Sequence, residues 1–173
     1  MSGLVGGLLH PLTVPAHGLA LLALGLLAGR QRAVDRYVSM AAFAAGLIAG
    51  LAAIASAVGP TAADVVVLVA AALAGLLVAL ARPLPLTAAA PLMAMSGIAL
   101  GLDSPPEAIS ITVATGMLIG TGLGASLAFA LVATCASRLM AAWQKIGMRI
   151  VGSWIAASAL LVLALRFARG QLF

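Results

Sequence analysis

Apolar residues fill the chain in six long runs, which are separated by short groups of charged residues and prolines. Because a helix needs about 20 apolar residues to cross the hydrocarbon layer of a membrane, each run is interpreted as a membrane-spanning helix. The pattern predicts an all-α fold, a polytopic integral membrane bundle of six transmembrane helices in a single transmembrane domain over residues 1–173. The predicted spans are residues 3–29, 37–58, 64–81, 85–102, 108–137 and 150–167.

Composition narrows the class of protein further. Hydrophobic residues make up 64% of the chain and charged residues only 8%, whereas soluble domains carry about 25% charged residues. Such an apolar chain would collapse rather than stay disordered. The net charge of +5 does not indicate nucleic-acid binding, because the basic residues are sparse and not interleaved with aromatic residues. The expected surroundings are a lipid bilayer. The lone Cys135 is expected to be a small buried hydrophobe.

The charges between the spans predict an orientation. Basic residues gather in the connections after the first, third and fifth spans, whereas those after the second and fourth hold only acids: Asp64, Asp103 and Glu107. Since Lys and Arg stay on the cytoplasmic side of short loops, both termini are expected to be periplasmic in a bacterial inner membrane. Arg166 and Arg169, near the C-terminus, depart from this rule and are expected to reach the headgroups by snorkelling.

Two local features concern the ends of the predicted spans. Residues 138–149 include Trp143 among basic residues, which indicates either a short helix lying in the membrane interface or a plain loop. The acids have a structural interpretation that is favoured over a proton or ion relay. Ser104 and Glu107 have the spacing of a capping box for the fifth span, and Thr61 and Asp64 have the same spacing before the third.

Glycines recur at four-residue intervals, a spacing that lets helices approach closely in lipid. Because the bilayer gives no hydrophobic drive for helix association, small residues of this kind typically mark helix contacts. The candidate packing glycines are Gly25, Gly29, Gly46, Gly50, Gly97, Gly101, Gly116, Gly120 and Gly124. We interpret them as contact positions rather than as the lining of a ligand cavity.

Both histidines lie in one unusual segment, residues 8–19, which also contains Pro11 and Pro15. Pro15 lacks a helix donor and clashes with the preceding turn, so the first helix is predicted to be broken near Pro11 and Pro15. Broken helices inside membranes mark ion sites in transporters. On a straight helix His10 and His17 would lie about 10.5 Å apart along the axis. A break would bring them together, or they would be successive stations on a path; alternatively, each imidazole simply bonds to a neighbouring carbonyl.

The sequence resembles the HupE/UreJ family of hydrogenase- and urease-accessory membrane proteins. The resemblance is carried by residues 7–13 (GLLHPLT) and 16–20 (AHGLA), which are similar to a first motif, His-Pro-x-x-Gly-x-Asp-His. Residues 95–103 (MSGIALGLD) have the frame of a second motif, Phe-His-Gly-x-Ala-His-Gly-x-Glu. Residues 116–121 (GMLIGT) and 149–153 (RIVGS) resemble the family's fifth-span glycine run and the start of its final helix. The resemblance implies a nickel or cobalt permease of six to eight spans.

Several family positions are substituted in this chain. Val14 and Ala16 replace the Gly and Asp of the first motif. In the second motif Ser96 and Leu100 replace the histidines and Asp103 replaces Glu, while Ala125 stands where a histidine is usual after the fifth-span threonine. The metal ligands that the resemblance implies are thereby reduced to His10, His17 and Asp103.

Three functions remain open at this point. The substitutions favour a non-transporting accessory or structural subunit of a larger membrane complex, whose partners would be other membrane-protein subunits. The alternative is a nickel or cobalt permease that uses His10 and His17, with Ni²⁺ or Co²⁺ as the transported ion. An intramembrane enzyme would have Ser96 and the histidines to use, but no carboxylate or nucleophile motif accompanies them, and the protein is expected not to be an enzyme.

Overall fold

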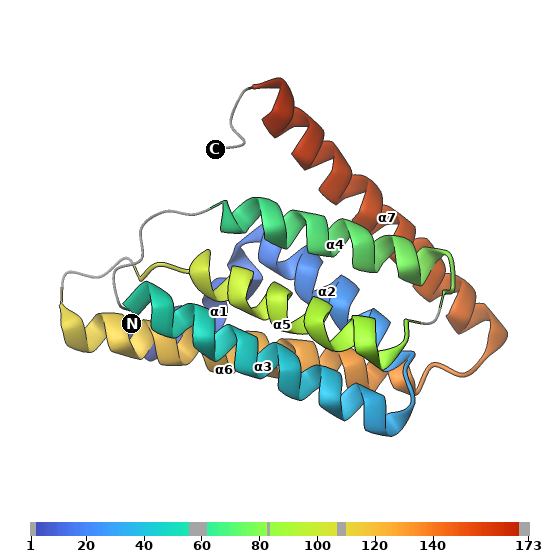
Figure 1. The fold of residues 1–173 in the computed structure, drawn as a ribbon, viewed down its shortest axis with the longest axis horizontal. Helices are drawn as coiled ribbons and strands as arrows, with labels where there is room; N and C mark the ends of the chain where they lie inside the picture. Colours follow the sequence, from blue (N-terminus) through green and yellow to red (C-terminus); the bar gives the residue numbers. More distant parts are fainter. Residues whose placement is uncertain (1–2, 56–61, 83, 107–109, 170–173) are drawn as a thin grey trace.

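The structure, a computed structural model, describes residues 3–55, 62–82, 84–106 and 110–169. These residues form seven α-helices and no strand (Figure 1). The helices are α1 (Gly3–Thr13), α2 (Pro15–Gly29), α3 (Ala33–Ala55), α4 (Ala63–Ala79), α5 (Leu86–Leu102), α6 (Ile111–Ser137) and α7 (Ala142–Ala168). The prediction of an all-α fold is confirmed.

Helix length and apolarity support a multi-pass membrane protein. Among the described residues α3, α6 and α7 are each long and apolar enough to cross a membrane. The helices α1 and α2 pass the same test together, but they are bent by 72° at the break between them. The apolar helices α4 and α5 have 17 residues each, so each is about 26 Å long. That length falls just below the roughly 30 Å of the hydrocarbon layer.

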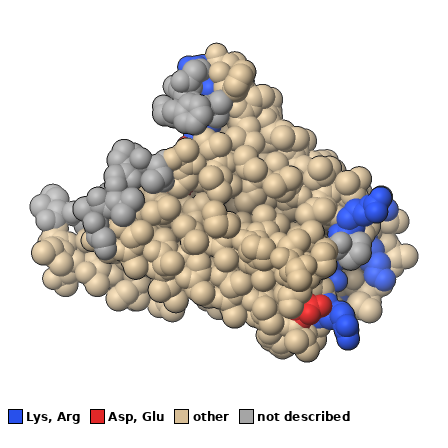
Figure 2. All heavy atoms as spheres, viewed as in Figure 1, with Lys and Arg blue, Asp and Glu red and all other residues tan. Residues whose placement is uncertain are grey.

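Seven of the nine Lys and Arg residues lie at or next to the α2–α3, α4–α5 and α6–α7 connections. Figure 2 shows blue side chains gathered at one end of the bundle, beside a red acidic side chain. The remaining two, Arg166 and Arg169, lie at the far end of α7. Arg166 forms an ion pair with Asp64 in the first turn of α4. The expectation that Arg166 only snorkels to the headgroups therefore misses its protein partner.

The two capping boxes predicted from the sequence are wrong in register. The hydroxyl of Ser104 donates to the Leu100 carbonyl and so closes α5. The helix α6 begins at Ile111 and is capped by Ser110, whose side chain accepts a hydrogen bond from Val113 N. Glu107 lies outside the described residues. Serine serves at both helix ends because its hydroxyl is able to donate or accept.

The second predicted capping box, Thr61 with Asp64 before α4, is also wrong in register. The residue that precedes α4 is Ala62, which has no side-chain cap, and Thr61 lies outside the described residues. Asp64 does lie in the first turn of α4, where a negative charge suits the helix dipole. Its carboxylate accepts from Val65 N and pairs with Arg166, so it ties α4 to α7.

The connection before the last helix is shorter than expected. The helix α7 begins at Ala142 and continues unbroken through 27 residues. Trp143 therefore belongs to the first turn of this span, and neither a separate interfacial helix nor a plain loop over residues 138–149 is correct. Cys135 is exposed on α6 rather than buried.

Glycines allow the closest helix contacts. A Cβ added at Gly46 or Gly50 on α3 would overlap the backbone of α5, and one added at Gly97 or Gly101 on α5 would overlap the backbone of α3. The helix pair α1 and α6 meets in the same way through Gly7 and Gly120. These interlocking backbones hold the bundle together where lipid supplies no hydrophobic drive.

The C-terminus of α4 is closed by three independent devices. Arg82 N donates to Leu77 O and Ala81 N to Val78 O, the paired bonds of a Schellman motif, with Ala81 in the left-handed region at φ 56°. Arg30 Nη1 donates to Val78 O at 2.9 Å. Arg149 Nε donates to Ala79 O at 2.9 Å. Two arginines of the basic end therefore also bind α2 and α7 to the end of α4.

Candidate metal centre

The bend between α1 and α2 follows directly from Pro15. Proline has no N–H and its ring clashes with the preceding helical turn, so it kinks or breaks a helix and is best suited to the first residue of a new one. The residue before a proline is pushed out of the helical region, and Val14 is extended, with φ −89° and ψ 112°. The helix axis turns by 72° at this point. The predicted break of the first helix is confirmed at this position.

Pro11 creates a second irregularity, which a neighbouring helix repairs. In a regular helix the N–H of residue 11 would bond to the carbonyl of Gly7, and proline leaves that carbonyl without its usual donor. The hydroxyl of Thr121 on α6 lies 3.3 Å from the Gly7 oxygen and donates to it. A buried carbonyl needs such a partner, and this bond fixes α1 against α6.

The bend brings the two histidines together. The ring centroids of His10, near the end of α1, and His17, in the first turn of α2, are 5.6 Å apart, with the rings at 70° to each other. This separation is about half the distance along the axis of a straight helix. The proline break therefore places the two imidazoles side by side rather than far apart along the helix.

Asp103 reaches the same site from the end of α5. Its Oδ2 lies 2.9 Å from His17 Nε2, so that the imidazole donates to the carboxylate. His17 is fully buried, whereas the Asp103 side chain is 26% exposed. With the Nε2 proton held by Asp103, a neutral His17 presents a lone pair at Nδ1. That nitrogen is buried and has no hydrogen-bond partner among the described residues.

The distance between the histidines suits a shared ion. Imidazole nitrogens bind zinc at about 2.0–2.1 Å, which places each ring centre about 3.2 Å from the ion. Two such rings at a tetrahedral angle have centres about 5.2 Å apart, close to the 5.6 Å observed. With an ion there, Asp103 would be the outer partner that orients a ligating histidine, an arrangement common at metal sites. A closed cage is not present, since no group of three or more His, Cys, Asp or Glu among the described residues has the arrangement to hold a metal.

Other candidate positions do not contribute to this centre. Ser96 and Leu100 are both buried, and the Ser96 hydroxyl donates to the Leu92 carbonyl on its own helix. The nine candidate glycines lie at helix contacts. Gly25 and Gly29 on α2 face α6, whereas Gly116, Gly120 and Gly124 on α6 face α1. Of these, Gly116 makes the loosest contact, with an added Cβ at 3.3 Å from Leu4 N.

Gly7 was missed from the sequence, whereas Thr121 is a hydroxyl residue of the predicted fifth span for which an interhelical partner is expected. Gly7 allows the approach of α1 to α6, and an added Cβ there would overlap the backbone of Met117. Thr121 repairs the carbonyl that Pro11 releases. Because Pro11 follows Gly7 by four residues, the sequence predicts that the Gly7 carbonyl lacks its helical donor. It does not predict which helix supplies the replacement.

One known protein family matches most of this chain. A family model described as "HupE / UreJ protein" matches residues 1–163, which is most of the chain and includes all three residues of the centre. No curated protein matches the chain, and no solved structure matches it.

Proposed function

The chain belongs to the HupE/UreJ family, and on that footing we propose that it is a membrane permease for a divalent transition-metal ion, nickel or cobalt. The ion would bind between His10 and His17, with Asp103 orienting His17. The substituted motif positions favour a non-transporting subunit because few ligands remain. The convergence of His10, His17 and Asp103 supports the permease instead, because the remaining candidates lie together.

The buried Nδ1 of His17 is the observation that supports this proposal most strongly. A buried acceptor without a partner carries a desolvation cost of about 1–3 kcal/mol. A bound cation would satisfy this lone pair, and imidazole suits Ni²⁺ and Co²⁺. The carboxylate of Asp103 lowers the cost of bringing a positive ion into this part of the bundle. Transport needs binding weak enough for release, which is in keeping with a site of two imidazoles rather than a closed cage.

The proposal places the chain in a bacterial inner membrane with six spans. The bent pair α1–α2 counts as one, and the short helices α4 and α5 cross as part of the bundle. The basic end faces the cytoplasm because Lys and Arg stay on that side, so both termini are periplasmic. In this proposal the chain is not an enzyme, and Ser96, whose hydroxyl donates to the Leu92 carbonyl, has a structural role.

Orientation is tested by fusing reporters to the C-terminus. Alkaline phosphatase, which folds only in the periplasm, should be active on the full-length chain, and green fluorescent protein should stay dark there. A fusion after Arg82, which lies at the basic end, should give the opposite pair of signals. A fluorescent C-terminal fusion with inactive phosphatase would overturn the proposed orientation.

Transport is tested with the purified protein in liposomes that enclose a nickel-sensitive dye. Ni²⁺ should enter faster than into protein-free liposomes, and Co²⁺ should compete. Mg²⁺ should not compete, because it prefers oxygen ligands in octahedral geometry. Absence of both Ni²⁺ binding in equilibrium dialysis and Ni²⁺ entry would exclude the permease.

The second candidate is the non-transporting accessory or structural subunit. It is favoured by the absence, among the described residues, of a group of three potential metal ligands. On this account the His17–Asp103 bond simply ties α2 to α5. Gentle detergent extraction should then recover the chain in a larger assembly at native expression levels, together with no Ni²⁺ binding. A free monomer that binds nickel would contradict the subunit and support the permease.

A further inference from the structure

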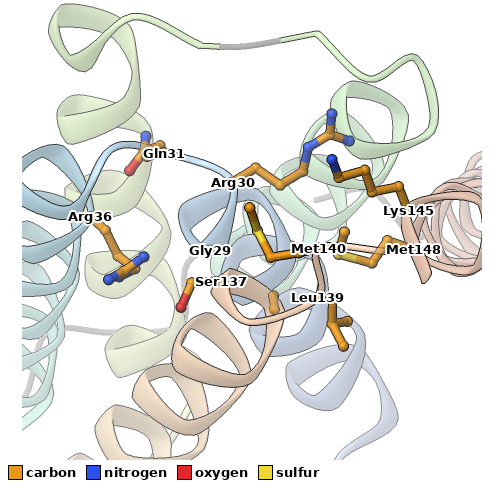
Figure 3. Close-up of a pocket in the computed structure, with 10 residues that line it drawn as sticks. Gly29, Arg30, Gln31, Arg36, Ser137, Leu139, Met140, Lys145 and Met148 are labelled. Atoms are coloured by element: carbon orange, nitrogen blue, oxygen red, sulfur yellow. The ribbon is translucent and has the colours of Figure 1, made fainter. Parts of the chain in front are cut away.

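A cavity of about 360 Å³ lies at the basic end of the bundle, at the opposite end of α2 from His17. It is formed where the end of α2, the start of α3, the end of α6 and the start of α7 meet (Figure 3). The described lining combines three cations and no acid. Its residues are Gly29, Arg30, Gln31, Arg36, Ala136, Ser137, Leu139, Met140, Lys145 and Met148.

The hydrogen-bond donors that line the cavity are only partly paired. Arg30 gives one nitrogen to the Val78 carbonyl and keeps its other donors. Gln31 accepts from the Ser39 hydroxyl at 2.8 Å through Oε1, while its Nε2 is buried without a partner among the described residues. A buried donor without an acceptor is costly. Cations that share a cavity without an acid are also mutually repulsive, and an anion bound between them would relieve that repulsion.

The rest of the lining suits a molecule that is only partly polar. Figure 3 shows the charged ends of Arg30 and Lys145 approaching each other from opposite sides, with Met140 and Met148 below them and with Gln31 and Arg36 on the other side of the cavity. Trp143 lies two residues before Lys145 and is strongly exposed, as expected of an anchor at the level of the lipid headgroups. The cavity is thus at headgroup depth, with a polar side and an apolar side.

We propose that this cavity binds a phosphate group between the charged ends of Arg30 and Lys145 (Figure 3), while Arg36 and Gln31 line its other side. Basic pockets between transmembrane helices bind phospholipid headgroups, and the apolar side formed by the methionines would accommodate the glycerol and first acyl carbons. The same side chains would also bind the phosphate of a small soluble compound. The site is independent of the proposed metal centre, because none of its lining residues belongs to that centre.

Native mass spectrometry of the full chain in nanodiscs tests this proposal. The nanodiscs contain phosphatidylcholine with a minor fraction of phosphatidylglycerol, and the readout is the amount of phosphatidylglycerol retained by the released protein. Lys145→Gln should lower its apparent affinity about fivefold, the effect of losing one basic side chain near an anionic headgroup, and Arg36→Gln, on the other side of the cavity, should lower it less. Gln31→Glu keeps the acceptor for Ser39 but replaces the buried donor with a negative charge, and should lower the affinity further.

The matched control is Arg138→Gln. Arg138 is an exposed cation at the same end of the bundle but outside the cavity lining, so its loss should change retention less than twofold. Arg30 is left intact because it also caps α4. Equal losses in Arg138→Gln and Lys145→Gln would show a diffuse surface charge and overturn the site.

A second arm separates the two sources of phosphate. Glycerol 3-phosphate is added to the protein in nanodiscs of phosphatidylcholine alone, and the melting temperature is recorded. Stabilisation that disappears in Lys145→Gln but persists in Arg138→Gln would support the phosphate site and assign it to a soluble compound. Retention of phosphatidylglycerol without such stabilisation assigns it to the lipid. Neither binding nor stabilisation in the folded wild type overturns the proposal.

Discussion

Replacing His17 with alanine should weaken Ni²⁺ binding by more than about 100-fold, because in the proposed permease His17 is a ligand rather than an outer partner. His17 supplies the buried Nδ1 that has no hydrogen-bond partner among the described residues. Asp103→Asn should have a smaller effect, about 10-fold to 100-fold, since asparagine still accepts from His17 Nε2 but lacks the charge. Equilibrium dialysis against Ni²⁺ in detergent measures both.

The control for these variants is Thr13→Ala. The Thr13 hydroxyl donates to the His10 carbonyl at the same bend and is exposed, so its loss should leave Ni²⁺ affinity within about twofold. Each variant must also elute as a single species and melt cooperatively. If folded His17→Ala binds Ni²⁺ as tightly as the wild type, the metal is not held at this centre, and the His17–Asp103 bond has a structural role alone.

Gly7→Ala and Gly6→Ala, adjacent substitutions on one helix, should change stability in opposite directions. A Cβ at Gly7 would overlap the carbonyl group of Met117, whose backbone is held within α6. Overpacking of this kind costs about 1–3 kcal/mol, or more where the backbone cannot move. A Cβ at Gly6 meets nothing within 4 Å, so alanine there should stabilise α1 by up to about 1 kcal/mol through helix propensity.

Unfolding of the two variants in mixed detergent micelles, followed by circular dichroism, measures this difference. Gly147→Ala on α7, which also meets nothing within 4 Å, serves as a second control outside α1. The close contact between α1 and α6 would be disproved if Gly7→Ala were as stable as Gly6→Ala. The same contact positions Thr121 for its bond to Gly7 O, so a destabilised Gly7→Ala should also bind Ni²⁺ more weakly than Gly6→Ala.

Local errors of prediction arose where several residues were able to serve the same role. Ser104 and Ser110 are both suitable helix caps, and tertiary packing decided that the first closes α5 and the second opens α6. The helix α7 extends eight residues before the predicted start at residue 150 because Trp143, Ile146 and the basic residues are compatible with a helix that emerges from the bilayer. Hydropathy predicts which residues lie in lipid, whereas the ends of a helix are set by its backbone hydrogen bonds.

Some helix contacts are predicted by glycine spacing in the sequence, and others are not. Gly46, Gly50, Gly97 and Gly101 show their role by their spacing, because a four-residue interval places small residues on one helix face. Gly75 and Gly152 have no such partner in sequence, yet an added Cβ at either would lie 2.8 Å from the carbonyl oxygen of the other. A contact formed by one glycine from each helix leaves no periodic signal.

The amino-acid sequence by itself determined the membrane class, the all-α fold, the break at Pro15 and the gathering of basic residues at the connections. These features depend on hydropathy, on the missing proline N–H and on charge, all of which are properties of single residues or short segments. Only the tertiary structure decided that His10, His17 and Asp103 meet. The angle of a proline bend and the helix that packs beside it are set by long-range packing, and residues 17 and 103 are joined by no local pattern. The substituted motifs show which ligands are missing, whereas the fold shows that the remaining ones lie together.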